Sequence, residues 1–207
     1  AKLDIFERVN SGVPLTRQQM RNCLFNGPAT RWLKKAATSS EFLSATGKTL
    51  DQKSMRDREA INRFCGFCLI GESKYIAGDM DVFLAQTLEK MQHSSVDLDD
   101  LYAKFIHSMR ANQTLFKDHA FRKSLAHMSD QPTRTVVNIA LFDVCSVLFA
   151  EIDNEVVESH AKPLRQAFAD LIHDPEFGNA ITYSTNSTRQ VKKRFAMARA
   201  ALAQVLQ

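Results

Sequence analysis

Hydrophobic residues recur three and four positions apart along most of this chain, which is the spacing of one helix face. No convincing strand, repeat or low-complexity segment follows the first ten residues. The fold class is therefore predicted to be all-α, a bundle of eight to ten helices with a short strand remnant at the N-terminus. The clearest helices are expected to begin at Asp79 and Asp97 and to cover residues 28–37, 55–70, 135–152, 155–173 and 187–206.

Three of the predicted helices have distinctive features. Residues 135–152 are apolar almost throughout, so this helix is expected to be central and buried. Pro163 lies within residues 155–173 and is expected to kink or divide that helix. In the last helix, Val191 and Phe195 share the apolar face that would dock on the core. The opposite arc of that helix is basic and is a candidate contact for phosphate groups or DNA; it consists of Arg189, Lys192, Lys193 and Arg199.

The first 26 residues have a different pattern. Residues 6–10 alternate as an extended strand does, which places Phe6 and Arg8 on one face. Asn10 starts a turn, and a capping box at residues 16–19 then starts a helix. An arginine and an asparagine at the end of a strand are well placed to face a ligand. A capped turn with Phe6 as a core residue explains the same pattern.

The composition suits a globular protein of one sizeable domain or two small ones, with 44% hydrophobic and 24% charged residues in 207. No apolar run reaches the ~18–20 residues of a membrane span, and the N-terminus lacks the pattern of a signal peptide. The four cysteines have no secretory context and are interpreted as reduced thiols. A cytoplasmic location without membrane contact is therefore predicted.

The net charge of +4 is unevenly distributed. Residues 1–60 carry 11 Lys and Arg against 6 Asp and Glu, residues 61–180 carry 11 against 17, and residues 181–207 carry 5 against none. Basic ends around an acidic middle would form a phosphate-binding surface if the fold brought the ends together. A solvated surface without a ligand accounts for the same charges, so both interpretations stay open.

The short motifs of common enzyme classes fail on their surroundings. Gly47-Lys48-Thr49 imitates the end of a phosphate-binding loop but lacks the earlier glycine and the preceding strand. Cys65 and Cys68 lie late in an apolar helix, which favours two buried core thiols over a redox pair or a zinc site. The six histidines show no metal-ligand spacing, and no serine nucleophile motif occurs. The sequence therefore predicts no catalytic residue and no metal site.

The densest charged cluster lies at residues 56–63. On a helix, Arg56, Glu59 and Arg63 share one face, so one carboxylate would bridge two guanidinium groups. A solvated ladder of ion pairs is one interpretation of this cluster. The other is that Arg56, Arg58 and Arg63 donate hydrogen bonds to a phosphate.

Two stretches near the N-terminus resemble a known family. FERVNSG at residues 6–12 and PLTRQQMRN at residues 14–22 are similar to the later part of the N-terminal domain of GmrSD-type modification-dependent restriction proteins. Gln19 replaces the glutamate that is usual in the family pattern. The resemblance continues, in the expected order, at residues 55–64, 78–84, 120–122 and 138–144.

The resemblance implies a ParB/sulfiredoxin-like α/β unit, whose end would be residues 1–26, followed by a helical domain over residues 27–207. The residues that would border a nucleotide site are Phe6, Glu7, Arg8 and Asn10. The D-G-Q-Q-R motif that the family associates with nucleotide hydrolysis does not occur in this sequence, and neither does an HNH nuclease motif. No cofactor is therefore expected for this chain, whereas a nucleoside triphosphate and a divalent metal would belong to a complete protein.

Two hypotheses from different classes follow. In the first, the chain is the helical portion of a GmrSD-like anti-phage restriction protein that supports a nucleotide site and contacts DNA or a subunit, without catalysis of its own. Its partners would be DNA, an upstream nucleotide-binding segment, and a nuclease domain or subunit. In the second, the chain is an all-α protein–protein interaction module with no nucleic-acid role.

Overall fold

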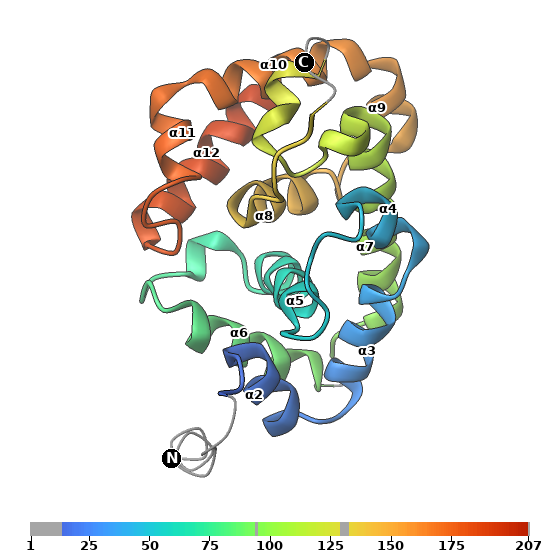
Figure 1. Ribbon diagram of the computed structural model, residues 1–207, viewed down its shortest axis with the longest axis vertical. Coiled ribbons are helices and arrows are strands. Elements are labelled where there is room, and N and C mark those ends of the chain that lie inside the picture. Colours follow the sequence, from blue (N-terminus) through green and yellow to red (C-terminus); the bar gives the residue numbers. More distant parts are fainter. Residues whose placement is uncertain (1–13, 94, 129–132, 207) are drawn as a thin grey trace.

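The computed structural model describes residues 14–93, 95–128 and 133–206. Within these ranges the fold is all-α, as predicted, with eleven α-helices, three short 3₁₀ helices and no sheet (Figure 1). The number exceeds the expected eight to ten because several helices are only six to eight residues long. The expected strand remnant at residues 6–10 lies outside the described residues.

The helices follow one another with short connections. In chain order, the α-helices are α2 (Arg17–Leu24), α3 (Pro28–Ala37), α4 (Ser40–Thr46), α5 (Arg56–Leu69), α6 (Met80–Met91), α7 (Leu98–Phe116), α8 (Ile139–Leu148), α9 (Asn154–Ser159), α10 (Ala161–His173), α11 (Pro175–Ala180) and α12 (Thr188–Val205). The 3₁₀ helices are η1 (Glu72–Lys74), η2 (Lys117–His119) and η3 (Lys123–His127). No helix in the described part of the chain combines the length and the apolarity that a membrane span requires.

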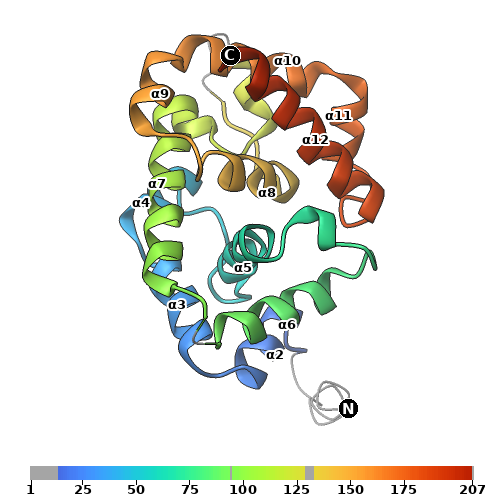
Figure 2. The ribbon, with the colours of Figure 1, turned by 180° about the vertical axis from the view of Figure 1, so that it is seen from behind.

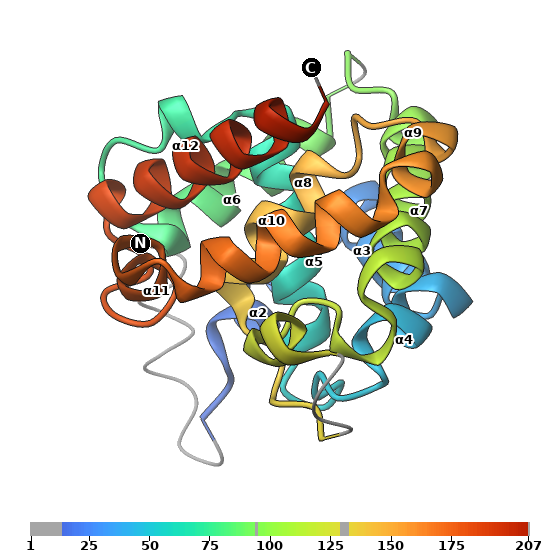
Figure 3. The same ribbon diagram turned by 90° about the horizontal axis from the view of Figure 1, so that it is seen from above.

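Helix α5 lies in the middle of the molecule, where it packs against α3, α6 and α8 (Figure 1). The long helix α7 runs along one side and contacts α3, α4, α8 and α9, as the view from behind shows (Figure 2). Helices α10 and α12 lie side by side over α8 (Figure 3). Segments that are far apart in the sequence therefore share one core.

Local hydrogen bonds explain where the helices begin. The capping box at α2 forms as predicted, because the Thr16 hydroxyl accepts from the Gln19 N–H at 3.2 Å and the Gln19 side chain accepts from the Thr16 N–H at 2.7 Å. Asp79 and Asp97 cap α6 and α7 as predicted. Each carboxylate accepts backbone N–H groups that have no partner inside the helix.

The predicted division of residues 155–173 is confirmed, and its position follows from the chemistry of proline. Helices α9 and α10 meet at His160, so Pro163 is the third residue of α10. The N–H groups of a first helical turn have no acceptor within the helix, so the missing proline N–H leaves no carbonyl unsatisfied there.

The helix expected over residues 135–152 is central and buried, but the predicted bounds are wrong. Helix α8 covers Ile139–Leu148, and every residue after Ile139 is buried. Asn138 ends the preceding extended segment, because its Oδ1 accepts from the Leu141 N–H at 3.0 Å. Val137 in that segment forms an isolated antiparallel bridge with Arg122. Apolarity alone did not reveal this capped start.

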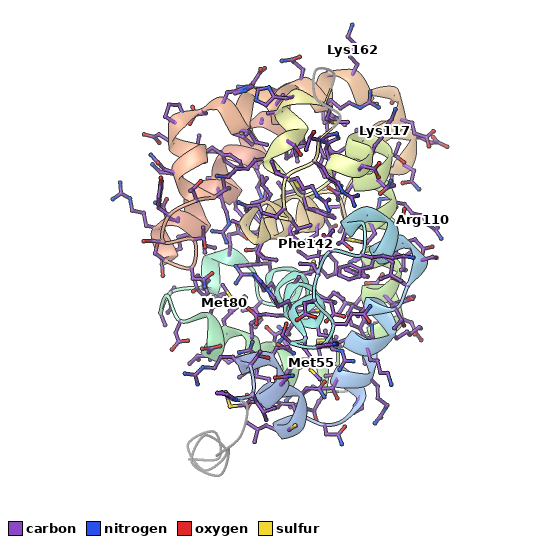
Figure 4. The ribbon with its side chains drawn as sticks, in the orientation of Figure 1. Met55, Met80, Arg110, Lys117, Phe142 and Lys162 are labelled. Carbon is purple, nitrogen blue, oxygen red and sulfur yellow. The ribbon has the colours of Figure 1, made fainter. Side chains whose placement is uncertain are left out.

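The core is rich in aromatic rings that surround α8. Phe142 is fully buried, and its ring centroid lies 4.7 Å from that of Phe121 and 6.3 Å from that of Phe42. Figure 4 shows Phe142 near the middle of the molecule, whereas Arg110 and Lys162 extend from its periphery. The rings of Phe42 and Phe142 join α4 to α8. The segment that follows α4 and the segment that precedes α8 form the candidate site.

Candidate anion-binding site

Arg63 belongs to the core. It is buried and donates two hydrogen bonds to the Asp143 carboxylate, from Nε at 2.8 Å and from Nη2 at 2.6 Å. Arg194, on α12, is also buried and donates to the same carboxylate at 2.6 Å. Arg63, Asp143 and Arg194 therefore form a buried ion-pair cluster that connects α5, α8 and α12, which we call the buried joint. Arg63 is not accessible to a phosphate. The expected bridge from Glu59 to Arg56 and Arg63 is also wrong, because no ion pair joins these residues in the described part of the chain and Glu59 lies 3.5 Å from Arg21 Nη2.

The buried joint is net positive, because two guanidinium groups share one carboxylate. Burial lowers the pKa of Arg194, and the Asp143 charge offsets this only in part. Burial also acts to lower the pKa of Arg63, but the charge and the hydrogen bonds of Asp143, together with the charge of Glu59, outweigh it, so the pKa is raised. Polar oxygens supply further acceptors, since Arg63 donates to Asn186 Oδ1 at 3.1 Å and Arg194 donates to the Thr185 carbonyl at 2.5 Å.

The basic arc predicted for the last helix is half neutralised. Lys193 Nζ lies 2.8 Å from Glu176 Oε2, and Arg199 donates two hydrogen bonds to the Glu72 carboxylate. The Arg199 hydrogen bond lowers the pKa of Glu72. Arg189 and Lys192 are exposed, and neither has a charged partner among the described residues. This face therefore offers two open cations and not four.

The remaining predicted residues divide between the described and the undescribed parts of the chain. Arg58 is half-buried, and its Nη1 lies 3.5 Å from Asn22 Oδ1. Arg56 is exposed at the first position of α5. The residues predicted to border a nucleotide site, Phe6, Glu7, Arg8 and Asn10, lie outside the described residues.

Arg56 lines a hollow of about 400 Å³, which we call the arginine pocket. One wall is the loop that follows α4, and the other is the extended segment that precedes α8. This volume lies within the range of small-molecule binding sites, roughly 300–1,000 Å³. The residues that line the arginine pocket are Thr49, Leu50, Asp51, Arg56, Arg134, Thr135, Val136 and Val137.

A third arginine, Arg122, lies behind the pocket wall that is formed by the loop after α4. Arg122 is 1% exposed and donates to the carbonyls of Ala120 at 2.9 Å and Thr46 at 2.7 Å, and to Thr49 Oγ1 at 3.1 Å. Its Nε has no hydrogen-bond partner among the described residues, and none of their carboxylates lies within ion-pair distance. Because a buried cation is costly without a counter-charge, Arg122 favours an anion nearby. Thr49 links it directly to the pocket wall.

The electrostatics of the arginine pocket favour negative ligands. The pKa of Arg122 is lowered, first by burial and then by the charge of Arg134, whereas the charge of Asp118 acts to raise it. Asp51 is the one carboxylate in the lining, and its pKa is lowered first by the Ser54 hydroxyl, which donates to it at 2.5 Å. Arg56 and Arg134 have no charged partner among the described residues. The pocket therefore combines two open guanidinium groups with one carboxylate that is already hydrogen-bonded.

The backbone around the arginine pocket is held in an unfavourable conformation. Among the described residues, five other than glycine have a positive φ, and three of them adjoin the pocket: Lys48 at 57°, Met55 at 59° and Phe121 at 62°. Each costs about 1–2 kcal/mol relative to a right-handed conformation. Such strain persists where surrounding contacts enforce it, and it is concentrated at functional sites. Two of these residues directly precede Arg56 and Arg122.

Gly47 lets one of the guanidinium groups reach the pocket. Its φ is +61°, and a Cβ at this position would lie 2.6 Å from Arg134 Nη1. The glycine therefore provides both the left-handed turn after α4 and the space into which Arg134 extends. As predicted, this segment is not a phosphate-binding loop, because the N–H groups of Gly47 and Lys48 donate to the α4 carbonyls of Ser44 and Leu43.

Hydrogen bonds also hold the opposite wall. The Thr135 N–H donates to Ser124 Oγ at 3.1 Å, and the Ser124 N–H donates to Thr135 Oγ1 at 3.3 Å. His119 Nδ1 lies 2.9 Å from the same Ser124 hydroxyl. Ser124 and His119 are buried, so this pair is a structural contact that positions the wall and not an accessible nucleophile and base.

The thiols are accounted for by packing. Cys65 is fully buried, and burial raises its pKa well above the ordinary value. Cys68 is half-buried, and burial raises its pKa to about 12. The prediction of core thiols is therefore confirmed for Cys65 and holds in weaker form for Cys68. A thiol that stays protonated is a poor nucleophile and a poor metal ligand.

Comparison with known protein families, with curated proteins and with solved structures gave no match to this chain. The site therefore has to be judged on its own geometry. Sequence reasoning found Arg56 but missed Arg122 and Arg134. Two signals were present, since residues 120–122 belong to the family resemblance and Gly47-Lys48-Thr49 imitates the end of a phosphate-binding loop. Nothing in the sequence indicated that Arg134 would face the same hollow.

Proposed function

We propose that this chain is a helical module that binds phosphate groups of DNA at the arginine pocket, without catalysis of its own. The observation that carries the proposal is that Arg56, Arg122 and Arg134 converge from three separate segments, and none has a carboxylate partner among the described residues. A bound phosphate would supply the missing counter-charge. Guanidinium groups suit this ligand because their paired donors match phosphate oxygens.

DNA is favoured over a free phosphate ion because the charge extends beyond the pocket. Lys48 and Lys53 are exposed on the same loop as Thr49 and Asp51, and a backbone with regularly spaced phosphates could contact several of these cations. The family resemblance supports the same ligand. In this proposal the chain is the helical portion of a GmrSD-like restriction protein, and nucleotide hydrolysis and cleavage belong to other segments or subunits.

The test is a DNA-binding assay in which the fluorescence anisotropy of a labelled duplex measures the binding. The variant Arg56→Glu/Arg134→Glu removes the two open guanidinium groups of the pocket, and the matched variant Arg189→Glu/Lys192→Glu removes the two open cations of α12. Both change the net charge equally, so general attraction to DNA falls by the same amount in each. All four side chains are exposed, so both variants should fold, which circular dichroism can check.

The proposal predicts a much larger loss of affinity for the pocket variant. For Arg56→Ala/Arg134→Ala, the slope of log affinity against log salt should become shallower by about 1.8, or about 0.9 for each lost phosphate contact. Equal losses in the two reversal variants would show that only net charge matters. A loss confined to the α12 variant would move the contact there. No loss in either variant would leave the protein–protein interaction module as the better account.

A further inference from the structure

Two histidines from distant parts of the sequence meet at the surface. His127 is the last residue of η3, His173 is the last residue of α10, and η3 packs along α10. Their Nε2 atoms lie 3.4 Å apart, and their ring centroids lie 4.9 Å apart. Both side chains are exposed. Packing therefore does not force the two nitrogen atoms together.

The distance between the nitrogens fits a shared metal ion better than a direct hydrogen bond. An N–H group and its acceptor are usually separated by about 2.7–3.2 Å, which is shorter than the distance observed here. Zinc binds histidine nitrogen at roughly 2.0–2.1 Å in a tetrahedral geometry, so two such nitrogens are about 3.3 Å apart. The separation of 3.4 Å is therefore close to the one expected for two ligands of one tetrahedral ion.

The surroundings also favour a cation. His173 ends a helix of 13 residues, and the C-terminal end of a helix carries a partial negative charge. The Lys123 ammonium, also on η3, is held by the Thr182 hydroxyl at 2.6 Å. Asp174 follows His173, but its Oδ1 accepts from the N–H groups of Glu176 and Phe177. Among the described residues, no group of three or more His, Cys, Asp or Glu side chains could hold a metal, so a metal at this position would have the two histidines as its ligands from the described part of the chain.

We propose that His127 and His173 form a two-ligand site for a divalent transition metal of the zinc class. Water or an outside ligand would occupy the other positions, as in sites that stay open to exchange. The sequence indicated no metal site, because 46 residues separate the two ligands and no local spacing relates them. The proposal does not depend on the arginine pocket, so either can fail without the other.

The test is isothermal titration calorimetry of the whole chain with zinc chloride at about pH 8, where imidazole is largely neutral. One zinc ion per chain is expected to bind. Loss of a supporting residue in a metal site typically weakens binding 10–100-fold, so His127→Ala and His173→Ala should each weaken it at least about tenfold. His93→Ala is the matched control, since His93 is also exposed but has no hydrogen bond or ring contact with another histidine among the described residues.

A spectroscopic readout tests the geometry directly. Cobalt in place of zinc should give the intense visible absorption of a tetrahedral ion, and either substitution at the pair should remove it. Thermal unfolding in the presence of a chelator should be the same for all the variants, which shows that they fold. The proposal is overturned if no saturable binding occurs, if binding survives both substitutions, or if His93→Ala weakens it equally.

Discussion

Asp143→Asn tests whether the buried joint depends on charge. The substitution preserves the shape of the side chain but removes the one negative charge that Arg63 and Arg194 share. The amide NH2 group cannot accept a hydrogen bond, so the bonds made to that atom are lost and those to the remaining oxygen become weaker. Two buried guanidinium groups then face a neutral amide. Removing one partner of a buried ion pair costs about 3–5 kcal/mol. For a chain of this length each kcal/mol lowers the Tm by roughly 2–4 °C, so a fall of about 6–20 °C is expected.

The measurement is urea unfolding of the wild type and Asp143→Asn, with thermal unfolding as a second assay. Asp170→Asn is the control, because Asp170 is exposed and its loss should change the free energy of unfolding by less than about 0.5 kcal/mol. A loss below about 1 kcal/mol for Asp143→Asn would refute the reasoning. The triple variant Asp143→Leu/Arg63→Met/Arg194→Met should recover much of the stability, because buried ion pairs can be replaced by apolar residues of similar volume.

Three further predictions concern the pocket, the thiols and the division of α9 from α10. Gly47→Ala should weaken DNA binding in the anisotropy assay because it displaces Arg134. Gly71→Ala, which also has a positive φ but whose Cβ would meet only Ser73 Oγ at 3.7 Å, should lower only the stability. In native protein, iodoacetamide should alkylate exposed Cys23 before the other three cysteines, and intact mass should show four adducts only after denaturation. Pro163→Ala should change the free energy of unfolding by less than about 1 kcal/mol in urea, because the residue lies in a first turn.

Local sequence predicted those parts of the fold that depend on local chemistry. The capping residues Thr16, Asp79 and Asp97 lie where the helical pattern begins, and each forms the hydrogen bonds that its side chain can make. The division of the helix just before Pro163 was likewise visible, since proline acts on its own helix. The all-α class follows from this agreement between periodicity and caps.

Predictions failed where a distant partner decides the outcome. Residues 135–138 are as apolar as the start of a helix would be, but Val137 pairs with Arg122 and Asn138 caps α8. The sequence pattern predicts Arg63 on a charged helix face, but its carboxylate partner lies 80 residues away on α8. The pairing of a charge across the core is a tertiary property that one sequence does not contain. The arginine pocket was missed for the same reason.

The counter-ion, and not the residue type, separates the arginines of this protein into structural and candidate functional ones. Arg63, Arg194 and Arg199 all donate to carboxylates, so their charge is already satisfied in the fold. Arg122 is as deeply buried as Arg194, but its acceptors are carbonyls and a hydroxyl. Arg194 has a carboxylate partner, whereas Arg122 has none among the described residues, so a negative ligand nearby would stabilise Arg122. That asymmetry, and not the overall positive charge, supports an anion at the arginine pocket.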